Sequence, residues 1–480
     1  MTPIATRETE TRRRGVAPLF APALPTLSLT DEEQSVLSRL TGLVTEDTWQ
    51  LRSLDDYFTG LSRMANLGIA VPPALQSIRT VTGWPRVVVD ALDERLDVDA
   101  LRCPDDPEAE DALGIIWDHN DLGDESQLAH LDALVYGRSY LTVGPGEDGI
   151  PLVTVESPQH MTVDYDVRTR TVRSALRLIS AGSQRAATLY LPDQTIDLTG
   201  SGTGWTIAER RPHDLGEVPV VRMANRQRSA DRRGSSEITE EVRALTDSAC
   251  RTLLGQEIAR EFFAAPQRYI LGASESAFQG PDGSPRGAWQ TYTGRYLALE
   301  RDEDGQVPEV GQFPAYDPAT YGRIVDLYAR LVAGVTGLPP HALGYTTDNP
   351  ASADAIRKSE ARLIKRAERR QRTFSRPWTQ CARLALRLAG APAPLPRIEV
   401  QWRDAATPTV AAAADATVKL VAAGVLPADS EVTLERAGIG RTQRQRIAAD
   451  RRRTAGRAAL DQIAETLGRP DDENGLGVAA

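Results

Sequence analysis

Apolar residues recur at two different spacings in the N-terminal half of the chain. Between 31 and 44 they follow a helical period, and Thr30 with Glu33 can form a capping box, so a helix is expected to begin here. Helical spacing favours three further ranges, which are 49–61, 84–98 and 127–136. Short strand-like runs separated by Gly, Pro and Asp then predict strands over 139–143, 152–156, 161–165, 172–180, 187–191 and 205–209. A mixed α+β region is therefore expected.

A long helix and a turn-rich segment are predicted after the strands. Ser235 or Ser236 can cap a helix whose apolar face reaches Phe262, and Pro266 prevents its simple continuation. Residues 266–316 contain short apolar runs separated by Gly and Pro, which favours short strands and turns. This stretch is expected to lead from one helix into the next.

A double proline separates two further predicted helices. Apolar residues at helical spacing predict a helix over 317–336, which Pro339 and Pro340 are expected to stop. Asn349 followed by Pro350 is a favourable helix start, because Asn caps well and Pro suits the first helical position. Between the two helices the sequence predicts a short loop without lysine or arginine.

The helix expected after Pro350 is strongly basic. Its apolar stripe extends to Leu388, with a kink expected at Pro377. The candidates for an external contact are Arg357, Lys358, Arg362, Lys365, Arg366 and Arg369, and further basic residues follow at Arg370 and Arg372. One interpretation is a solvated helix with i,i+4 ion pairs. The other is contact with an acidic neighbouring subunit or with DNA phosphate, and the pattern leaves both open.

Composition limits the class of protein. With 480 residues and 41% hydrophobic residues, the chain is expected to form two or more domains. It has no apolar run of membrane length and no secretory signal, so synthesis in the cytosol and no membrane contact are expected. Its formal net charge of -10 argues against non-specific wrapping of nucleic acid. The three cysteines, Cys103, Cys250 and Cys381, are expected to be buried core residues.

Catalytic, cofactor and metal motifs are missing from the sequence. The lysines are Lys358, Lys365 and Lys419. None follows a glycine, so the phosphate-binding loop of an ATPase is absent. The acidic run 118–124 resembles the start of a calcium loop, but Leu122 and Ala129 stand where ligands are needed. We therefore expect no catalytic residues, no cofactor and no metal site.

Several segments in fixed order carry a family resemblance. They are WPRVVVDALDERLDV, HLDALVYGRSYLTVGP, SSEITEEVRALTDSACRTL, PQRYILG and TGLPPHALGYTTDNPASADAIRKSEARL. This series resembles the portal proteins of tailed bacteriophages, in the form found in siphoviruses and in prophages of actinobacteria, from about residue 30 to 390. The segment 57–60 is a weak version of a tyrosine-rich block expected near the N-terminal edge.

The resemblance implies a portal fold: an α/β wing, paired stem helices, a small α/β clip and a helical crown, assembled as a ring around a channel. Such a ring, usually a dodecamer, occupies one capsid vertex of the virion after assembly in the host cytoplasm. The implied partners are double-stranded DNA, the terminase large subunit, the major capsid and scaffolding proteins and a head-completion adaptor. The implied role is structural, in genome packaging and DNA ejection, and not enzymatic.

The portal architecture can be placed on this chain range by range. The expected parts are a flexible arm (1–27), wing (28–234), stem helix (235–265), clip (266–316), second stem helix (317–336), tunnel loop (337–351), long kinked helix returning to the wing (352–402) and crown with C-terminal tail (403–480). The channel-lining residues are expected to be Leu343, Gly344, Tyr345, Thr346, Thr347, Asp348 and Asn349.

Two other classes of protein compete with this interpretation. One is a different head or neck connector, for which the chain is long. The other is a DNA-processing enzyme such as a nuclease or terminase subunit, which the missing phosphate loop and the lack of a carboxylate cluster disfavour.

Overall fold

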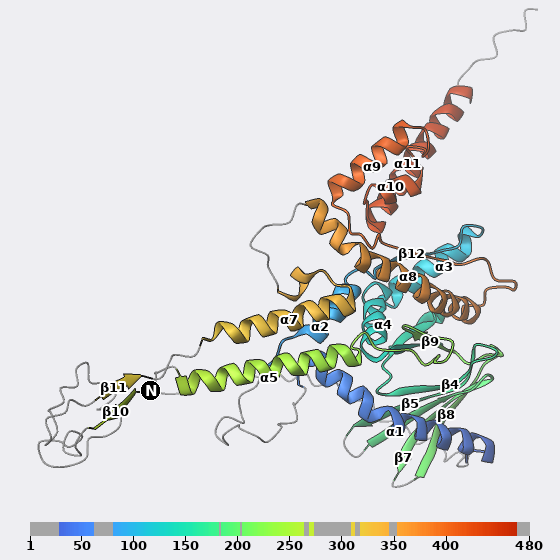
Figure 1. Cartoon of the computed structure of the whole chain (residues 1–480). Coiled ribbons are helices and arrows are strands. Elements are labelled where there is room, and N and C mark those ends of the chain that lie inside the picture. The colour runs from blue at the N-terminus through green and yellow to red at the C-terminus, as the bar shows by residue number, and fades with distance from the viewer. Residues whose placement is uncertain are drawn as a thin grey trace, which may run out of the picture.

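A computed structural model describes residues 28–61, 80–181, 184–201, 204–263, 268–272, 309–312, 317–344 and 353–467. Helices and antiparallel sheets both contribute, as the residue patterns predicted (Figure 1). The predicted N-terminal arm lies outside these ranges. Among the helices described, none has the length and apolar character required to cross a bilayer.

Helix α1 (Asp31–Thr59) lies against a five-stranded sheet (Figure 1). The predicted capping box is present, because Thr30 accepts from the Glu33 amide and the Glu33 side chain accepts from the Thr30 amide. The helix continues through 49–59 without a break, so the two helices expected here are one. Its buried Leu37 and Leu40 pack on the sheet, which gives the N-terminal helix a hydrophobic anchor.

The five-stranded sheet is an antiparallel meander. Its strands are β4 (Met161–Asp166), β5 (Thr171–Ala181), β6 (Gln184–Tyr190), β7 (Gln194–Ser201) and β8 (Gly204–Pro212). Sequence patterns predicted four of them and missed β7. Its sequence, QTIDLTGS, mixes turn-forming Asp, Gly and Ser with strand formers, and Ile196 and Leu198 become core residues only through pairing with β6 and β8.

A three-stranded sheet of order β3-β2-β9 packs in the main core. It consists of β2 (Arg138–Gly144), β3 (Leu152–Glu156) and β9 (Val220–Ala224). A turn of 3-10 helix, η2 (Glu147–Gly149), joins the first two strands. β9, with the sequence VVRMA, was also missed from sequence, because so short a run cannot be assigned by periodicity.

The main core gathers helices around α8 (Ala353–Leu388). They are α2 (Trp84–Asp93), α3 (Pro107–His119) and α4 (Leu122–Tyr136). Strand β1 (Val98–Arg102) pairs with the distant β12 (Glu399–Trp402) across the same core. The predicted helix over 84–98 therefore ends at Asp93, and α8 runs through Pro377.

Aromatic contacts fix the middle of α8. His130 of α4 is fully buried, accepts a hydrogen bond from Trp378 Nε1 at 2.9 Å and stacks on Phe374 with ring centroids 5.4 Å apart. Burial lowers the pKa of His130 to about 3, so this histidine is a neutral core residue.

Two long helices extend away from this body (Figure 1). They are α5 (Glu240–Phe263) and α7 (Ala319–Thr336), which lie side by side. Beyond them β10 (Arg268–Leu271) and β11 (Glu309–Gln312) form a small antiparallel pair. Most of the predicted segment 266–316 lies outside the described residues.

The predicted serine cap of the first long helix is wrong. α5 begins five residues after Ser235, because the segment before it is held against α4. Ser236 Oγ donates to the Val135 carbonyl at 2.5 Å, and the Glu237 amide donates to the Leu134 carbonyl at 2.9 Å. These contacts keep the serine out of a cap position.

The C-terminal part is helical, as predicted. It contains α9 (Val410–Ala422), α10 (Glu431–Arg436) and the long α11 (Arg441–Leu467). Arg444, which is 4% exposed in its side chain, pairs with Asp99 of β1 and ties this part to the body.

Candidate functional site

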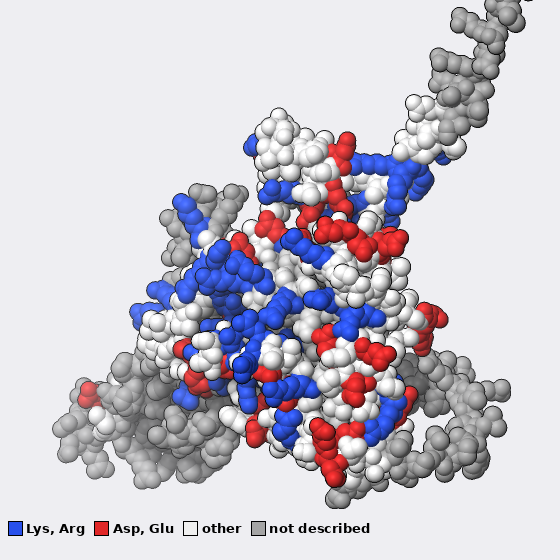
Figure 2. Space-filling model, turned by 90° about the vertical axis from the view of Figure 1, so that its right-hand side faces the viewer, with Lys and Arg blue, Asp and Glu red and all other residues white. Residues whose placement is uncertain are grey.

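Basic side chains gather on one face of the molecule (Figure 2). Part of this charge comes from α8, which carries the basic run predicted from sequence. Arg362, Arg366 and Arg370 are four residues apart and therefore share one side of the helix. Arg366 and Arg370 of this stripe contact a single buried carboxylate in the segment before α5.

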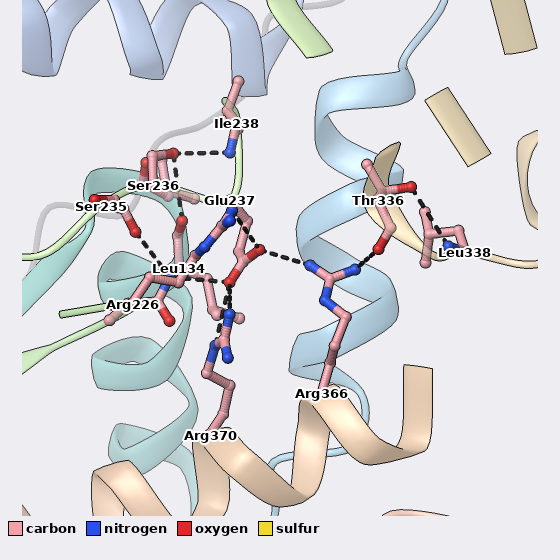
Figure 3. Close-up of polar contacts among 12 residues, drawn as sticks. Leu134, Arg226, Ser235, Ser236, Glu237, Ile238, Thr336, Leu338, Arg366 and Arg370 are labelled. Carbon is pink, nitrogen blue, oxygen red and sulfur yellow. Dashed lines mark hydrogen bonds and ion pairs between the residues drawn. The ribbon is translucent and has the colours of Figure 1, made fainter. Parts of the chain in front are cut away.

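Glu237 stands at the centre of that meeting point (Figure 3). Its side chain is 0% exposed and lies 2.6 Å from Arg366 Nη2 and 2.6 Å from Arg370 Nη2. Arg226 approaches to 3.6 Å, and Asn225 Nδ2 donates to Glu237 Oε1 at 3.1 Å. One carboxylate is thus shared by three guanidinium groups, two from α8 and one from the loop after β9.

The electrostatic balance of this cluster requires both Glu237 and its arginine partners. Burial opposes ionisation of Glu237, but the guanidinium groups of Arg370 and Arg366 outweigh burial and hold the pKa of Glu237 below its usual value. A buried ion pair adds little net stability over an apolar pair, whereas removal of one partner leaves a costly unpaired charge. The cluster therefore fixes the positions of the segments that contribute to it, and removal of any one charged member is expected to destabilise the fold.

The arginine stripe also holds the end of α7. Arg366 Nη1 donates to the Thr336 carbonyl, and Arg362 Nη1 donates to the Gly334 carbonyl at 3.1 Å. Carbonyls in the last turn of a helix lack intrahelical partners and carry partial negative charge, so guanidinium donors there are favourable. A side chain at Gly337 would collide with Arg362, because its Cβ would lie 2.7 Å from Arg362 Nε.

These contacts connect three elements that are far apart in sequence. Glu237 precedes α5 by three residues, Thr336 is the last residue of α7, and Arg366 belongs to α8. Both paired helices are therefore fixed to the body at their inner ends through the same guanidinium group.

The six basic residues predicted for an external contact separate into groups. Arg362 and Arg366 are engaged inside their own chain, and Lys365 pairs with Glu368 at 2.8 Å. Lys358 and Arg369 are exposed on α8, and the side chain of Arg357 lies outside the described residues.

Sequence patterns missed the central member of the cluster. Glu237 is an ordinary acidic residue in the segment SSEITEE, and its arginine partners lie 129 and 133 residues away. No local spacing marks it. Arg370 was noticed only as part of a basic run.

The predicted channel-lining loop is described only at its start. Leu343 is buried and Gly344 has φ 82°, a left-handed conformation that favours glycine. Tyr345, Thr346, Thr347, Asp348 and Asn349 lie outside the described residues.

Helix α7 ends at the predicted residue, but a glycine that the sequence analysis did not single out caps it. The helix stops at Thr336, where Gly337 caps it with φ 72°, before either proline. Pro339 is extended, and Pro340 instead begins a turn of 3-10 helix, η4 (Pro340–Leu343).

The described residues hold no cluster of His, Cys, Asp and Glu suited to a metal ion. The acidic run 118–124 spans the end of α3 and the start of α4, as an ordinary helix end and turn.

Comparison with known proteins identifies relatives over most of the chain. The family described as "Phage portal protein, SPP1 Gp6-like" matches residues 44–454. The portal protein of Mycobacterium phage D29 is 38% identical over 393 residues, covering 78% of this chain and 80% of that protein. The portal protein of Mycobacterium phage L5 is 35% identical over 420 residues, covering 84% and 86%.

Solved structures with a similar chain come from gene transfer agent particles. The virion of the native particle gives a TM-score of 0.44 at 16% identity, over 82% of this chain and 93% of that chain. The neck of the native particle, computed with C12 symmetry, gives 0.44 at 16% identity over 75% and 91%.

Proposed function

The chain belongs to the SPP1 Gp6-like family of phage portal proteins, and from this premise we propose that twelve copies form the DNA channel at one capsid vertex. The observation that carries the proposal is the match to portal proteins from residue 44 to 454, with relatives 35–38% identical over most of their length. Closed rings of identical subunits need a different contact surface on each side of the subunit.

The arrangement of the elements supports a portal assignment of the ranges. Under this proposal α1 to β9 form the wing, α5 and α7 the stem, and β10 with β11 the described part of the clip. α8 returns from the tunnel loop to the body, and α9 to α11 form the crown. The Glu237 cluster then lies where the stem joins the wing.

The proposed role is passive conduction of DNA. The terminase large subunit drives the genome inward through the ring, and the same ring later releases it. A conduit must not hold its cargo, and each phosphate that a protein neutralises adds salt-dependent affinity. The net charge of -10 suits such a surface.

The tunnel loop is proposed to line the narrowest part of the channel. Between His341 and Pro350 the sequence contains no lysine or arginine, and Thr346, Thr347, Asp348 and Asn349 are small and polar. Such a loop can touch a phosphate backbone without retaining it.

Outside partners are proposed by region. The clip is the proposed docking surface for the terminase during packaging and for a head-completion adaptor afterwards. The major capsid and scaffolding proteins are further proposed partners. The protein is proposed to act without catalysis or a cofactor, in the virion and, during assembly, in the host cytoplasm.

The test is the assembly state of the purified full chain. Native mass spectrometry and negative-stain imaging are expected to show closed rings with a central channel. A monomer that cleaves DNA in the presence of divalent metal would overturn the proposal.

A further inference from the structure

An arginine-lined hollow lies beside the Glu237 cluster on the outer side of α8. Its volume is about 590 Å³, and eight of its fifteen lining residues are arginine. None of these described lining residues is acidic. They come from the β4–β5 turn, from β9 with the loop after it and from α8, so the hollow is formed by tertiary structure. Blue side chains gather in a dense patch on the face that Figure 2 shows.

Two of the eight arginines, Arg226 and Arg370, belong to the Glu237 cluster, but most of the others are not paired with a carboxylate in this way. Arg170, Arg232, Arg369 and Arg376 have no ion pair among the described residues. Arg222 is covered instead by the ring of Tyr165, 3.7 Å from its guanidinium carbon. Like charges this close repel one another, and the repulsion is larger where the surroundings are partly desolvated. The hollow is therefore suited to an anionic occupant.

A complementary surface lies on α3 of the same chain. Its outward side presents Glu108, Asp111 and Asp118, with Ile115 between them 58% exposed. Further exposed carboxylates stand on either side of α3, at Asp105, Asp121 and Asp124. Apart from Asp118, which pairs with Arg441, none of these six acids has an ion pair among the described residues.

The two surfaces cannot meet within one subunit. Arg369 and Arg376 lie on the side of α8 opposite Trp378, by the helical period. Trp378 faces α3, with its ring centroid 6.2 Å from that of Trp117. The core contact thus places α3 on one side of α8 and the hollow on the other. A subunit with unmatched basic and acidic surfaces on different sides is suited to a head-to-tail contact that closes into a ring.

We propose that the arginine-lined hollow of one subunit binds the acidic side of α3 from the next subunit in the ring. This inference rests on the proposed ring and names the surfaces that build it. Arginine suits the role because its planar fork can bind a carboxylate in bidentate fashion. Ile115 adds an apolar contact beside Val172 and Pro377, which also line the hollow.

DNA is the less suitable occupant of the hollow. The guanidinium groups would bind phosphates with an affinity that depends on salt, and moving DNA would be retarded at every subunit. This conflicts with passive conduction.

The test uses two charge-reversed full-length chains. The first carries Arg369→Glu and Arg376→Glu in the hollow, and the second carries Glu108→Arg and Asp111→Arg on α3. In each chain alone the substituted side chains face like charges at every contact, so the concentration needed for ring assembly is expected to rise roughly tenfold or more. Mixed in equal amounts, the two chains regain opposite charges at every contact and are expected to form rings in which they alternate.

Native mass spectrometry of the mixture, with one chain carrying a mass tag, measures this directly. Recovery of mixed rings also shows that both variants fold. Arg453→Glu with Arg457→Glu, two exposed changes on α11 with the same total charge change as the hollow variant, is the matched control and should assemble as the wild type does.

Three results would overturn the inference. One is normal ring assembly by either variant alone. Another is failure of two well-folded variants, judged by circular dichroism, to form mixed rings. A third is a hollow variant that keeps its rings but loses binding to a short DNA duplex, which would assign the hollow to DNA. Absence of rings from the wild-type protein would instead overturn the proposed function, and the inference with it.

Discussion

Two arginine-rich regions share one helix and differ in how their charge is balanced. On one side of α8, Arg366 and Arg370 meet the buried Glu237 within the same chain. Toward the other side, Arg369 and Arg376 line a hollow that Arg370 also borders and whose described lining contains no acid. Arg366 and Arg369 are thus three residues apart on α8, yet the first is paired with Glu237 and the second lines the hollow. A basic run in sequence is therefore not one feature but two.

Removal of the buried carboxylate should have the largest effect. Glu237→Ala leaves three guanidinium groups without their shared partner, and the free energy of unfolding is expected to fall by about 3–5 kcal/mol. Chemical denaturation of the subunit measures it. Glu240→Ala, at an exposed glutamate whose ion-pair partner among the described residues is Arg243, is the control and should change stability by less than about 1 kcal/mol. Equal effects of the two changes would contradict a stabilising role for the Glu237 cluster beyond that of an exposed ion pair.

Lowering the pH should reduce the contribution of the Glu237 cluster to the free energy of unfolding. The folded-state pKa of Glu237 is depressed, so its contribution is complete above the unfolded value of about 4.3 and is lost as pH falls below it. Glu237→Gln removes this titration, and the unfolding free energy of the variant should depend less steeply on pH between about 4.5 and 3. Parallel pH profiles for the two proteins would contradict the assignment.

Replacing a guanidinium by an amine should have a smaller effect. Arg366→Lys keeps the charge near Glu237 but cannot serve the carboxylate and the Thr336 carbonyl together through a planar fork. A loss of about 1–2 kcal/mol is expected in chemical denaturation. Arg369→Lys, on the hollow side, should leave subunit stability within about 0.5 kcal/mol of the wild type. A larger loss of unfolding free energy for Arg369→Lys than for Arg366→Lys would contradict the assignment of different roles to these two arginines.

Substitutions in the tunnel loop are expected to change subunit stability and ring assembly least. Thr346→Arg with Thr347→Arg places two cations where the sequence has none, and subunit stability and ring assembly should not change. DNA passage through such rings is expected to be slower at low salt and to recover as salt rises. Packaging rates that match the wild type at low salt would contradict a channel position for this loop. Thr346→Ser with Thr347→Ser is the neutral control.

Much of the element order could be predicted from local pattern. The capping box at Thr30 and Glu33, the two long helices before and after 266–316 and the basic helix down to Leu388 all follow from spacing within one or two turns. The weaker predictions failed where local and distant contacts compete. Ser236 has a good capping side chain, yet its hydroxyl donates to α4 instead.

The candidate site depended more strongly on tertiary structure. The run of basic residues on α8 was visible in sequence, but which of them would be neutralised internally was not. That outcome depends on a glutamate 129 residues away from Arg366, and a single carboxylate carries no periodic signal. Likewise the arginines of the hollow come from three separate segments.

The amino-acid sequence by itself determined most of the helices, though not α3, most of the strands and the family, because these depend on periodicity, caps and segment order along the chain. The tertiary structure alone decided that β7 and β9 are strands, that Glu237 is buried among arginines and that the basic and acidic surfaces lie on different sides of α8. The physical reason is the distance along the sequence over which each interaction acts. Helical spacing acts over a few residues, whereas a buried charge requires partners that only the packed chain brings within 3 Å.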